Sequence, residues 1–167
     1  MPSGSITFYI DTSSSILVAG LIKDNVVIAE IKETLGKDLS TNTLYLIENM
    51  FNKCLVDVND IDRIVVVNGP GSFTGIRIGI TIAKTYAWAL NKKITTLSSL
   101  EAMSISTKED KYKIPFIDAR RGYVFAGIYN DKNEVVLENQ YIKLDELIEK
   151  VKVLNVPHVF ISNDKLV

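Results

Sequence analysis

The amino-acid sequence predicts a mixed α/β protein with two lobes, and three observations support this fold class. Strand-like segments come first in the chain, and strands then alternate with helix-like segments. A glycine-rich turn over residues 68–79 connects a continuous apolar run to a long apolar segment that ends near Leu90. A second series of strands begins after the polar stretch 107–113. We therefore expect an N-terminal lobe over residues 1–106 and a shortened C-terminal lobe over residues 107–167.

The N-terminal lobe is expected to open with a three-stranded meander. Apolar and polar residues alternate from Ile6 to Ile10, which is the period of a half-buried strand. Two further strand-like runs, 16–22 and 26–30, are separated by residues that suit a hairpin turn. Apolar residues at helical spacing then predict a helix over 40–55, and an apolar run predicts a strand over 63–67. A helix over 74–90, a strand over 94–97 and a brief helix ending near Ile105 complete this lobe.

The C-terminal lobe repeats the alternation of strand and helix without a detectable sequence repeat. Strands are expected over 114–117 and 123–129, joined by the turn Asp118-Ala119-Arg120-Arg121-Gly122. A third strand over 135–143, a helix over 145–153 and a strand over 159–162 follow.

Composition narrows the class of protein. Of 167 residues, 47% are hydrophobic and 23% are charged, which is typical of a globular chain. The net charge of −1 argues against a general nucleic-acid or membrane-surface binder. Cys54 is the single cysteine and His158 the single histidine. One cysteine cannot form an internal disulfide or a cysteine zinc site, and one distant histidine makes a serine–histidine mechanism a poor hypothesis. No signal peptide and no membrane-spanning run are visible, so we expect a cytoplasmic protein.

The second helix carries a stripe of small residues. Gly75, Gly79, Ala83 and Ala87 recur at every fourth position, where another helix backbone can approach closely. Most of the remaining circumference is apolar, so the helix must be covered on more than one side. We expect this stripe to contact a partner protein or a second copy of the chain. The alternative is that both faces are covered within the monomer.

The polar turns offer little catalytic chemistry. The glycine-rich turn is not a Walker motif or a G-x-G-x-x-G motif, and Ser72 is not in a nucleophile elbow. Asp11, Thr12 and Ser13 could contact a nucleotide phosphate, with Asp11 facing magnesium, but a hydrogen-bonded hairpin turn is the favoured interpretation. The turn at 118–122 could contact an anion, and a solvated hairpin is again favoured. These residues indicate a binding module more than a catalyst.

Three ordered segments resemble the TsaB (YeaZ) family. They are Ile10-Asp11-Thr12-Ser13, the glycine-rich turn, and the segment 116–124. The signature loop of that family is matched here by Gly69, Pro70, Gly71, Ser72, Phe73, Thr74, Gly75 and Arg77. The likeness extends over nearly the whole chain.

The resemblance implies the actin/sugar-kinase/Hsp70-like (ribonuclease H-like) fold in two lobes and a non-catalytic role. TsaB-like proteins are partners of TsaD, which transfers a threonylcarbamoyl group to the adenosine beside the anticodon in tRNAs that read A-starting codons. They dock on TsaD through the first two helices of the N-terminal lobe, and the ATPase TsaE joins the assembly. The expected interface residues are Leu46, Met50, Gly75, Gly79, Ala83 and Ala87.

Further expectations follow from the same resemblance. A homodimer should form when TsaD is absent, and tRNA should be met only through the complex. No cofactor is expected on the chain alone, while ATP or ADP could bind at the partner interface. Ser99 and Met103 stand where TsaD has its two metal-binding histidines, and neither replaces an imidazole. Family members generally continue beyond this length, which leaves the second lobe short.

Two alternatives from other classes stay open. One is a weak enzyme, either an ATPase or phosphotransferase that uses Asp11 or a peptidase. The other is a homodimeric scaffold unrelated to tRNA.

Overall fold

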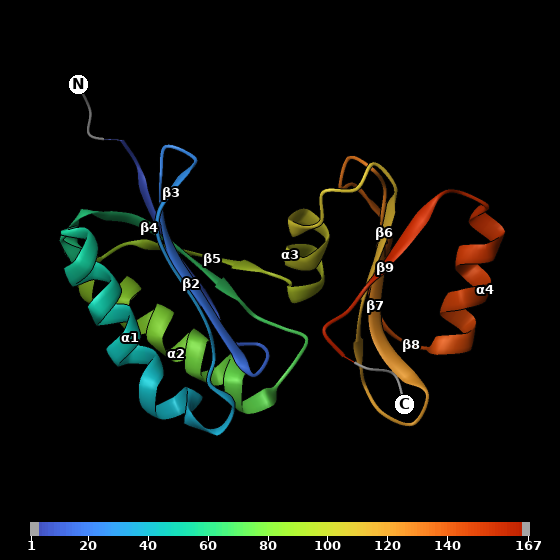
Figure 1. Ribbon diagram of the computed structural model, residues 1–167, viewed down its shortest axis with the longest axis horizontal. Helices are drawn as coiled ribbons and strands as arrows, with labels where there is room; N and C mark the ends of the chain where they lie inside the picture. Colours follow the sequence, from blue (N-terminus) through green and yellow to red (C-terminus); the bar gives the residue numbers. More distant parts are fainter. Residues whose placement is uncertain (1–3, 165–167) are drawn as a thin grey trace. The chain divides into compact units, whose positions relative to one another are not determined.

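A computed structural model describes residues 4–164 of the chain (Figure 1). The chain forms two compact units, one ending at Leu97 and the other beginning at Ser98. The boundary therefore falls before helix α3 (Ser99–Ser106), and not after it as the sequence suggested. The reason is packing, because Leu100 is fully buried and the Ser104 hydroxyl donates to Asn133 Oδ1 of the second unit at 3.1 Å.

The first unit contains a five-stranded mixed sheet in the order β3-β2-β1-β4-β5. The predicted meander is present as β1 (Ile6–Asp11), β2 (Ile16–Lys23) and β3 (Val26–Thr34), with antiparallel pairing. β4 (Ile61–Val67) lies parallel to β1, and β5 (Lys93–Leu97) lies parallel to β4. The strand β3 runs longer than predicted, because it pairs with β2 as far as Thr34.

Helices α1 (Leu39–Cys54) and α2 (Phe73–Leu90) cover one face of this sheet (Figure 1). Short 3-10 turns, Gly36–Asp38 and Val58–Asp60, precede α1 and β4. Phe8 of β1 lies between the helices, with ring centroids 5.7 Å from Phe51 of α1 and 5.5 Å from Tyr86 of α2. The alternation predicted for residues 6–10 thus places Ile6, Phe8 and Ile10 in the core.

Hydrogen bonds at both ends of α2 determine where the helix begins after the glycine-rich turn and where it ends. The Ser72 hydroxyl accepts a hydrogen bond from the Gly75 N–H at 3.2 Å, which satisfies one of the unpaired donors at the N-terminus. Asn91 ends the helix in the left-handed region, and its N–H bonds back to the last turn.

The second unit contains a four-stranded sheet in the order β8-β7-β6-β9. β6 (Tyr112–Asp118), β7 (Tyr123–Tyr129) and β8 (Val135–Lys143) are antiparallel, and β9 (His158–Ile161) lies parallel to β6. Helix α4 (Leu144–Leu154) covers one face, and its Leu147 and Val151 join the core of this unit. Figure 1 shows α3 on the opposite face of the same sheet.

The two units share one topology. Each has a three-stranded antiparallel meander, then a helix, then a strand parallel to the first strand of the meander. Thus β1 corresponds to β6, α1 to α4 and β4 to β9. This structural repeat was not visible in the sequence, because equivalent positions share an apolar period rather than residue identity, apart from positions such as Asp11 and Asp118.

Candidate docking site

Helix α2 turns its small residues toward the interior of its own unit. Gly75, Gly79 and Ala83 are buried, and a Cβ atom on Gly79 would overlap the hydroxyl of Thr12. That hydroxyl donates to the Gly75 carbonyl at 2.6 Å, and Thr12 is itself buried. The predicted partner contact through these three small residues is therefore wrong. They are small because α2 approaches the end of β1 closely.

The other expected interface residues also face the core. Met50 is 5% exposed, and Leu46 and Ala87 are half-buried against the hydrophobic core of the first unit. These side chains hold α1 and α2 on the sheet. The structure therefore supports the alternative prediction, in which the stripe of small residues is covered by the rest of its own unit.

The opposite side of α2 is open and carries large side chains. Phe73 and Trp88 are 75% and 85% exposed. The guanidinium of Arg77 lies 5.2 Å from the centroid of the Phe73 ring. At 100° per residue these three positions fall within one side of the helix. The helical spacing of Phe73, Arg77 and Trp88 is present in the sequence. The regular spacing of the small residues was the stronger signal, and it led to a predicted interface that did not include Trp88.

Helix α1, which packs against α2, also carries exposed apolar side chains. Leu44 and Tyr45 are 47% and 63% exposed. The two helices run parallel, since Leu39 lies beside Gly75 and the Phe51 ring stacks 6.4 Å from Tyr86. We call the exposed set Leu44, Tyr45, Phe73, Arg77 and Trp88 the docking face.

A hollow of about 470 Å³ lies between the C-terminal half of α1 and Tyr86 of α2. Glu48, Phe51 and Asn52 are among its lining residues. Burial, and then the negative charge of Glu48, raise the pKa of the Tyr86 phenol. The phenol is therefore neutral at ordinary pH, and the hollow offers both an apolar floor and polar groups.

The turn that joins β1 to β2 is locked by its own hydrogen bonds. Asp11 Oδ1 accepts from the Ser13 N–H at 2.8 Å, which is an Asx turn. The Ser13 carbonyl accepts from the Ser72 N–H at 2.7 Å, so the turn is also tied to the glycine-rich loop. Thr12 is used to hold α2, as described above. These contacts agree with the hairpin-turn interpretation of Asp11, Thr12 and Ser13.

The turn that joins β6 to β7 repeats this lock but is open to solvent. Asp118 Oδ1 accepts from the Arg120 N–H at 2.8 Å. Arg120 and Arg121 both adopt left-handed backbone angles, with φ of 70° and 55°. Both side chains are exposed, and Arg120 Nη1 lies 3.8 Å from Asp118 Oδ2.

The described residues show no cluster that could hold a metal ion. Within residues 4–164, no three histidine, cysteine, aspartate or glutamate side chains gather as a metal site would need. His158 is exposed, and its Nδ1 lies 2.9 Å from the Val156 carbonyl in a turn. Ser99 and Met103, which the resemblance led us to compare with the transferase histidines, lie one turn apart on α3.

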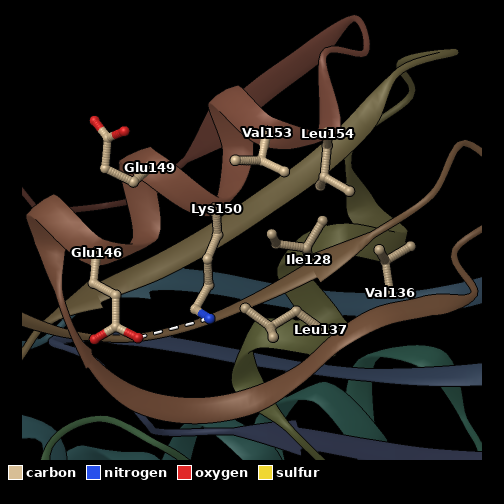
Figure 2. Close-up of a pocket in the computed structure, with 8 residues that line it drawn as sticks. All are labelled: Ile128, Val136, Leu137, Glu146, Glu149, Lys150, Val153 and Leu154. Atoms are coloured by element: carbon tan, nitrogen blue, oxygen red, sulfur yellow. Dashed lines mark ion pairs between the residues drawn. The ribbon is translucent and has the colours of Figure 1, made fainter.

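An apolar hollow of about 400 Å³ lies between α4 and strands β7 and β8 (Figure 2). Ile128, Leu137 and Leu154 line it, and Val153 at its edge is 83% exposed. Glu146 and Lys150 at one end form an ion pair of 3.7 Å, drawn as the dashed line. It contains none of the predicted site residues, and its side chains suit an apolar group. Separately, none of the helices over residues 4–164 is apolar over a length that would cross a bilayer.

Known proteins resemble the chain over most of its length. The family model described as TsaD, tRNA N6-adenosine threonylcarbamoyltransferase, matches residues 27–161. The tRNA threonylcarbamoyladenosine biosynthesis protein TsaB of Bacillus subtilis (strain 168) is 38% identical over 159 residues, which cover 93% of this chain and 69% of that protein. The protein of the same name from Buchnera aphidicola subsp. Schizaphis graminum is 26% identical over 165 residues, covering 95% of this chain and 78% of its own length.

Two solved structures from Pseudomonas aeruginosa share the fold. YeaZ superposes with a TM-score of 0.73 at 24% identity, covering 84% of this chain and 67% of that one. An uncharacterized protein with similarity to peptidase YEAZ superposes with a TM-score of 0.76 at 21% identity, covering 83% and 67%. The predicted fold class, α/β of the actin/sugar-kinase/Hsp70-like type, is confirmed. With 38% identity to a TsaB protein across nearly all of its residues, the chain belongs to the TsaB (YeaZ) family.

Proposed function

We propose that this chain acts in tRNA threonylcarbamoyladenosine biosynthesis as a non-catalytic partner of TsaD. The names of its relatives supply the pathway. The observation that carries the partner role is the docking face, where Trp88 and Phe73 project from α2 beside the exposed side of α1. Tryptophan and arginine, which α2 exposes on one side at Trp88 and Arg77, are residue types that dominate the energetics of protein–protein interfaces.

The proposal changes which side of α2 meets the partner. The small-residue stripe holds the helix in place, and the side with Phe73, Arg77 and Trp88 makes the contact. Since these side chains hold up no core, substitution should weaken docking without unfolding the chain.

The non-catalytic assignment is supported by the residues present. Ser99 and Met103 replace an imidazole pair with a hydroxyl and a thioether, which are poor ligands for the metals that two histidines bind. The lone His158 is engaged with a turn carbonyl. Binding of ATP or ADP is expected only at the interface with the partner. Titration of nucleotide into the separate chain and into the complex tests this expectation.

The first test is reconstitution of the modification. Threonylcarbamoylation of tRNA is measured with the donor synthase, TsaD and TsaE, with and without this chain. Modification that requires the chain, while the chain alone has no activity, supports the accessory role. Equal modification without it refutes the role and favours a homodimeric scaffold. ATP turnover by the chain alone that disappears in Asp11→Asn favours the weak-enzyme alternative.

The second test places the contact on the docking face. Trp88→Ala is expected to weaken binding to TsaD by at least about 30-fold, the effect of losing one central hot-spot side chain. Phe160→Ala is a matched control, because Phe160 is an exposed aromatic residue of the second unit. Circular dichroism of both variants checks the fold. Unchanged binding by Trp88→Ala would rule out this side of α2 as the centre of the interface. If TsaE joins only the assembled pair, its recruitment should fail in the same variant.

A further inference from the structure

Aromatic and basic side chains gather on one face of the sheet in the second unit. In the antiparallel ladder of β7 and β8, Tyr123 pairs with Lys143 and Phe125 pairs with Tyr141. Directly opposed residues project from the same face of a sheet. The turn between β6 and β7 adds two cations next to this face. We call the set Tyr123, Phe125, Tyr141, Lys143, Arg120 and Arg121 the aromatic–basic face.

The rings of this face are stacked but do not belong to the core. Tyr123 and Tyr141 lie parallel, with centroids 4.6 Å apart and planes at 3°, and Phe125 lies 5.5 Å from Tyr141. The residues between them, Val124 and Ile142, point to the other face and fill the core against α4. Tyr141 remains 55% exposed, so the stacked rings are accessible to a further planar group.

Three cations lie around the rings, and the carboxylates of Asp118 and Asp164 lie beside the turn, where Asp164 Oδ2 accepts from the Asp118 N–H at 2.8 Å. Lys143 Nζ lies 5.9 Å from the Tyr123 ring centroid. Within residues 4–164, neither Lys143 nor Arg121 has a carboxylate within ion-pair distance, while Arg120 shares its charge with Asp118 at 3.8 Å. The side chain of Arg120 is 88% exposed. Cations beside exposed aromatic rings are complementary to an anionic polymer that carries flat groups.

The backbone of the turn adds an independent argument. Two successive arginines adopt the left-handed conformation, which costs a non-glycine residue free energy and is usually left to glycine or asparagine. Folding alone gives no reason for arginine at these two positions. Residues held at such angles are concentrated at binding sites.

We propose that the aromatic–basic face binds single-stranded RNA. Bases stack on the exposed ring of Tyr141 and its neighbours, and Arg120, Arg121 and Lys143 contact the phosphates. An acidic peptide would use the cations but would leave the stacked rings without a planar partner, and duplex RNA hides its base faces. This contact goes beyond the expectation that tRNA is met only through the complex. The identification of this RNA as a tRNA loop rests on the function proposed above. The stacking of bases on these rings does not depend on that function.

The experiment measures binding of a labelled seven-nucleotide single-stranded RNA, at low salt, to the whole chain. Tyr141→Ala is expected to weaken binding by at least about fivefold, the lower limit for loss of one base stack. Tyr141→Phe keeps the ring and should bind as the parent does. Phe160→Ala is the control, since Phe160 lies on the α4 side of the same sheet, with its ring 6.2 Å from core residue Phe116. The same RNA in a duplex should bind more weakly.

The cations are tested by salt dependence. Arg121→Gln and Lys143→Gln should each lower the slope of log affinity against log salt by about 0.7, the value for one phosphate contact on a single strand. Lys132→Gln, an exposed lysine of the same unit, should leave the slope unchanged. Equal RNA binding by Tyr141→Ala and the parent overturns the proposal, as does tighter binding of the duplex.

Docking to TsaD is measured on the same variants, so that the two proposals fail separately. Tyr141→Ala should retain TsaD binding, and Trp88→Ala should retain RNA binding. Loss of TsaD binding in Tyr141→Ala, without loss of RNA binding, would make this face a protein interface and refute the RNA assignment. Equal modification without this chain in the reconstituted reaction, with RNA binding intact, would refute only the accessory role.

Discussion

Replacing Gly79 by alanine adds one methyl group where α2 lies against Thr12. The new Cβ would overlap Thr12 Oγ1, and that hydroxyl cannot move away without breaking its 2.6 Å hydrogen bond to the Gly75 carbonyl. Overpacking of this kind costs about 1–3 kcal/mol, and the lost hydrogen bond costs about 0.5–1.5 kcal/mol. The gain in helix propensity from glycine to alanine offsets about 1 kcal/mol. The variant should therefore lose roughly 0.5–3.5 kcal/mol of unfolding free energy.

Urea denaturation is the assay. Far-ultraviolet circular dichroism follows the whole chain, and the fluorescence of Trp88, the single tryptophan, reports on the first unit. Thr81→Ala is the matched control, because Thr81 is exposed on the same helix and changes propensity without touching Thr12. The double variant with Thr12→Ala removes the overlapping hydroxyl and should recover part of the loss, which appears as a coupling energy between the two sites.

A Gly79→Ala variant that is about 1 kcal/mol more stable than the parent would refute this reasoning. Such a result would mean that the added methyl group meets open space and that the small-residue stripe is free for a partner. Gly79→Leu should unfold the first unit, because leucine adds more atoms at the same contact with Thr12.

Three further outcomes are expected. Leu55 is 91% exposed and ends α1 with φ of 55°, so Leu55→Gly should raise the urea midpoint by the equivalent of about 0.5–1 kcal/mol with an unchanged m value. Asn133 already has a left-handed backbone, so Asn133→Gly adds no strain and removes the oxygen that accepts from buried Lys113 Nζ at 2.8 Å and from the Ser104 hydroxyl at 3.1 Å; thermal unfolding should show a loss of about 1–3 kcal/mol. Burial raises the pKa of Tyr9 and of Tyr86, so the folded state keeps these protons longer than the unfolded state. Their contribution to the unfolding free energy is fully present below the unfolded pKa of 10.0 and is lost as pH rises above it. Denaturation measured over a range of pH should therefore show a smaller loss of stability at alkaline pH in Tyr9→Phe than in the parent.

Local patterns predicted most of the elements. The alternation in residues 6–10 gave β1, helical spacing gave α1 and α2, and the polar turn after Asp118 gave the β6–β7 hairpin. These signals depend on neighbours a few residues apart, so one sequence is enough to read them.

The side of α2 that faces the core could not be read in the same way. Regular spacing of Gly75 and Gly79 indicates that something approaches closely, but it does not identify what approaches. The answer is Thr12, whose hydroxyl bonds a residue 63 positions away. Because this side of α2 packs against Thr12, we assign the partner contact to the opposite side of the helix, where the large side chains of the docking face are exposed. The lobe boundary was misplaced for a similar reason, because α3 is tied to its unit through Asn133, far along the chain.

The turns after β1 and β6 are equivalent in topology and carry the same aspartate lock, yet they are not interchangeable parts. The first is held between the glycine-rich loop and α2 through Thr12 and Ser13, so a graft from the second turn would put an arginine at the position of buried Ser13. The reverse graft places serines at exposed positions, where the cost comes from the left-handed backbone and is greatest at Gly122, with φ of 75°. The first turn is therefore constrained by its contacts with the rest of its unit, whereas the arginine side chains of the second turn project into solvent and can be replaced without disturbing a core.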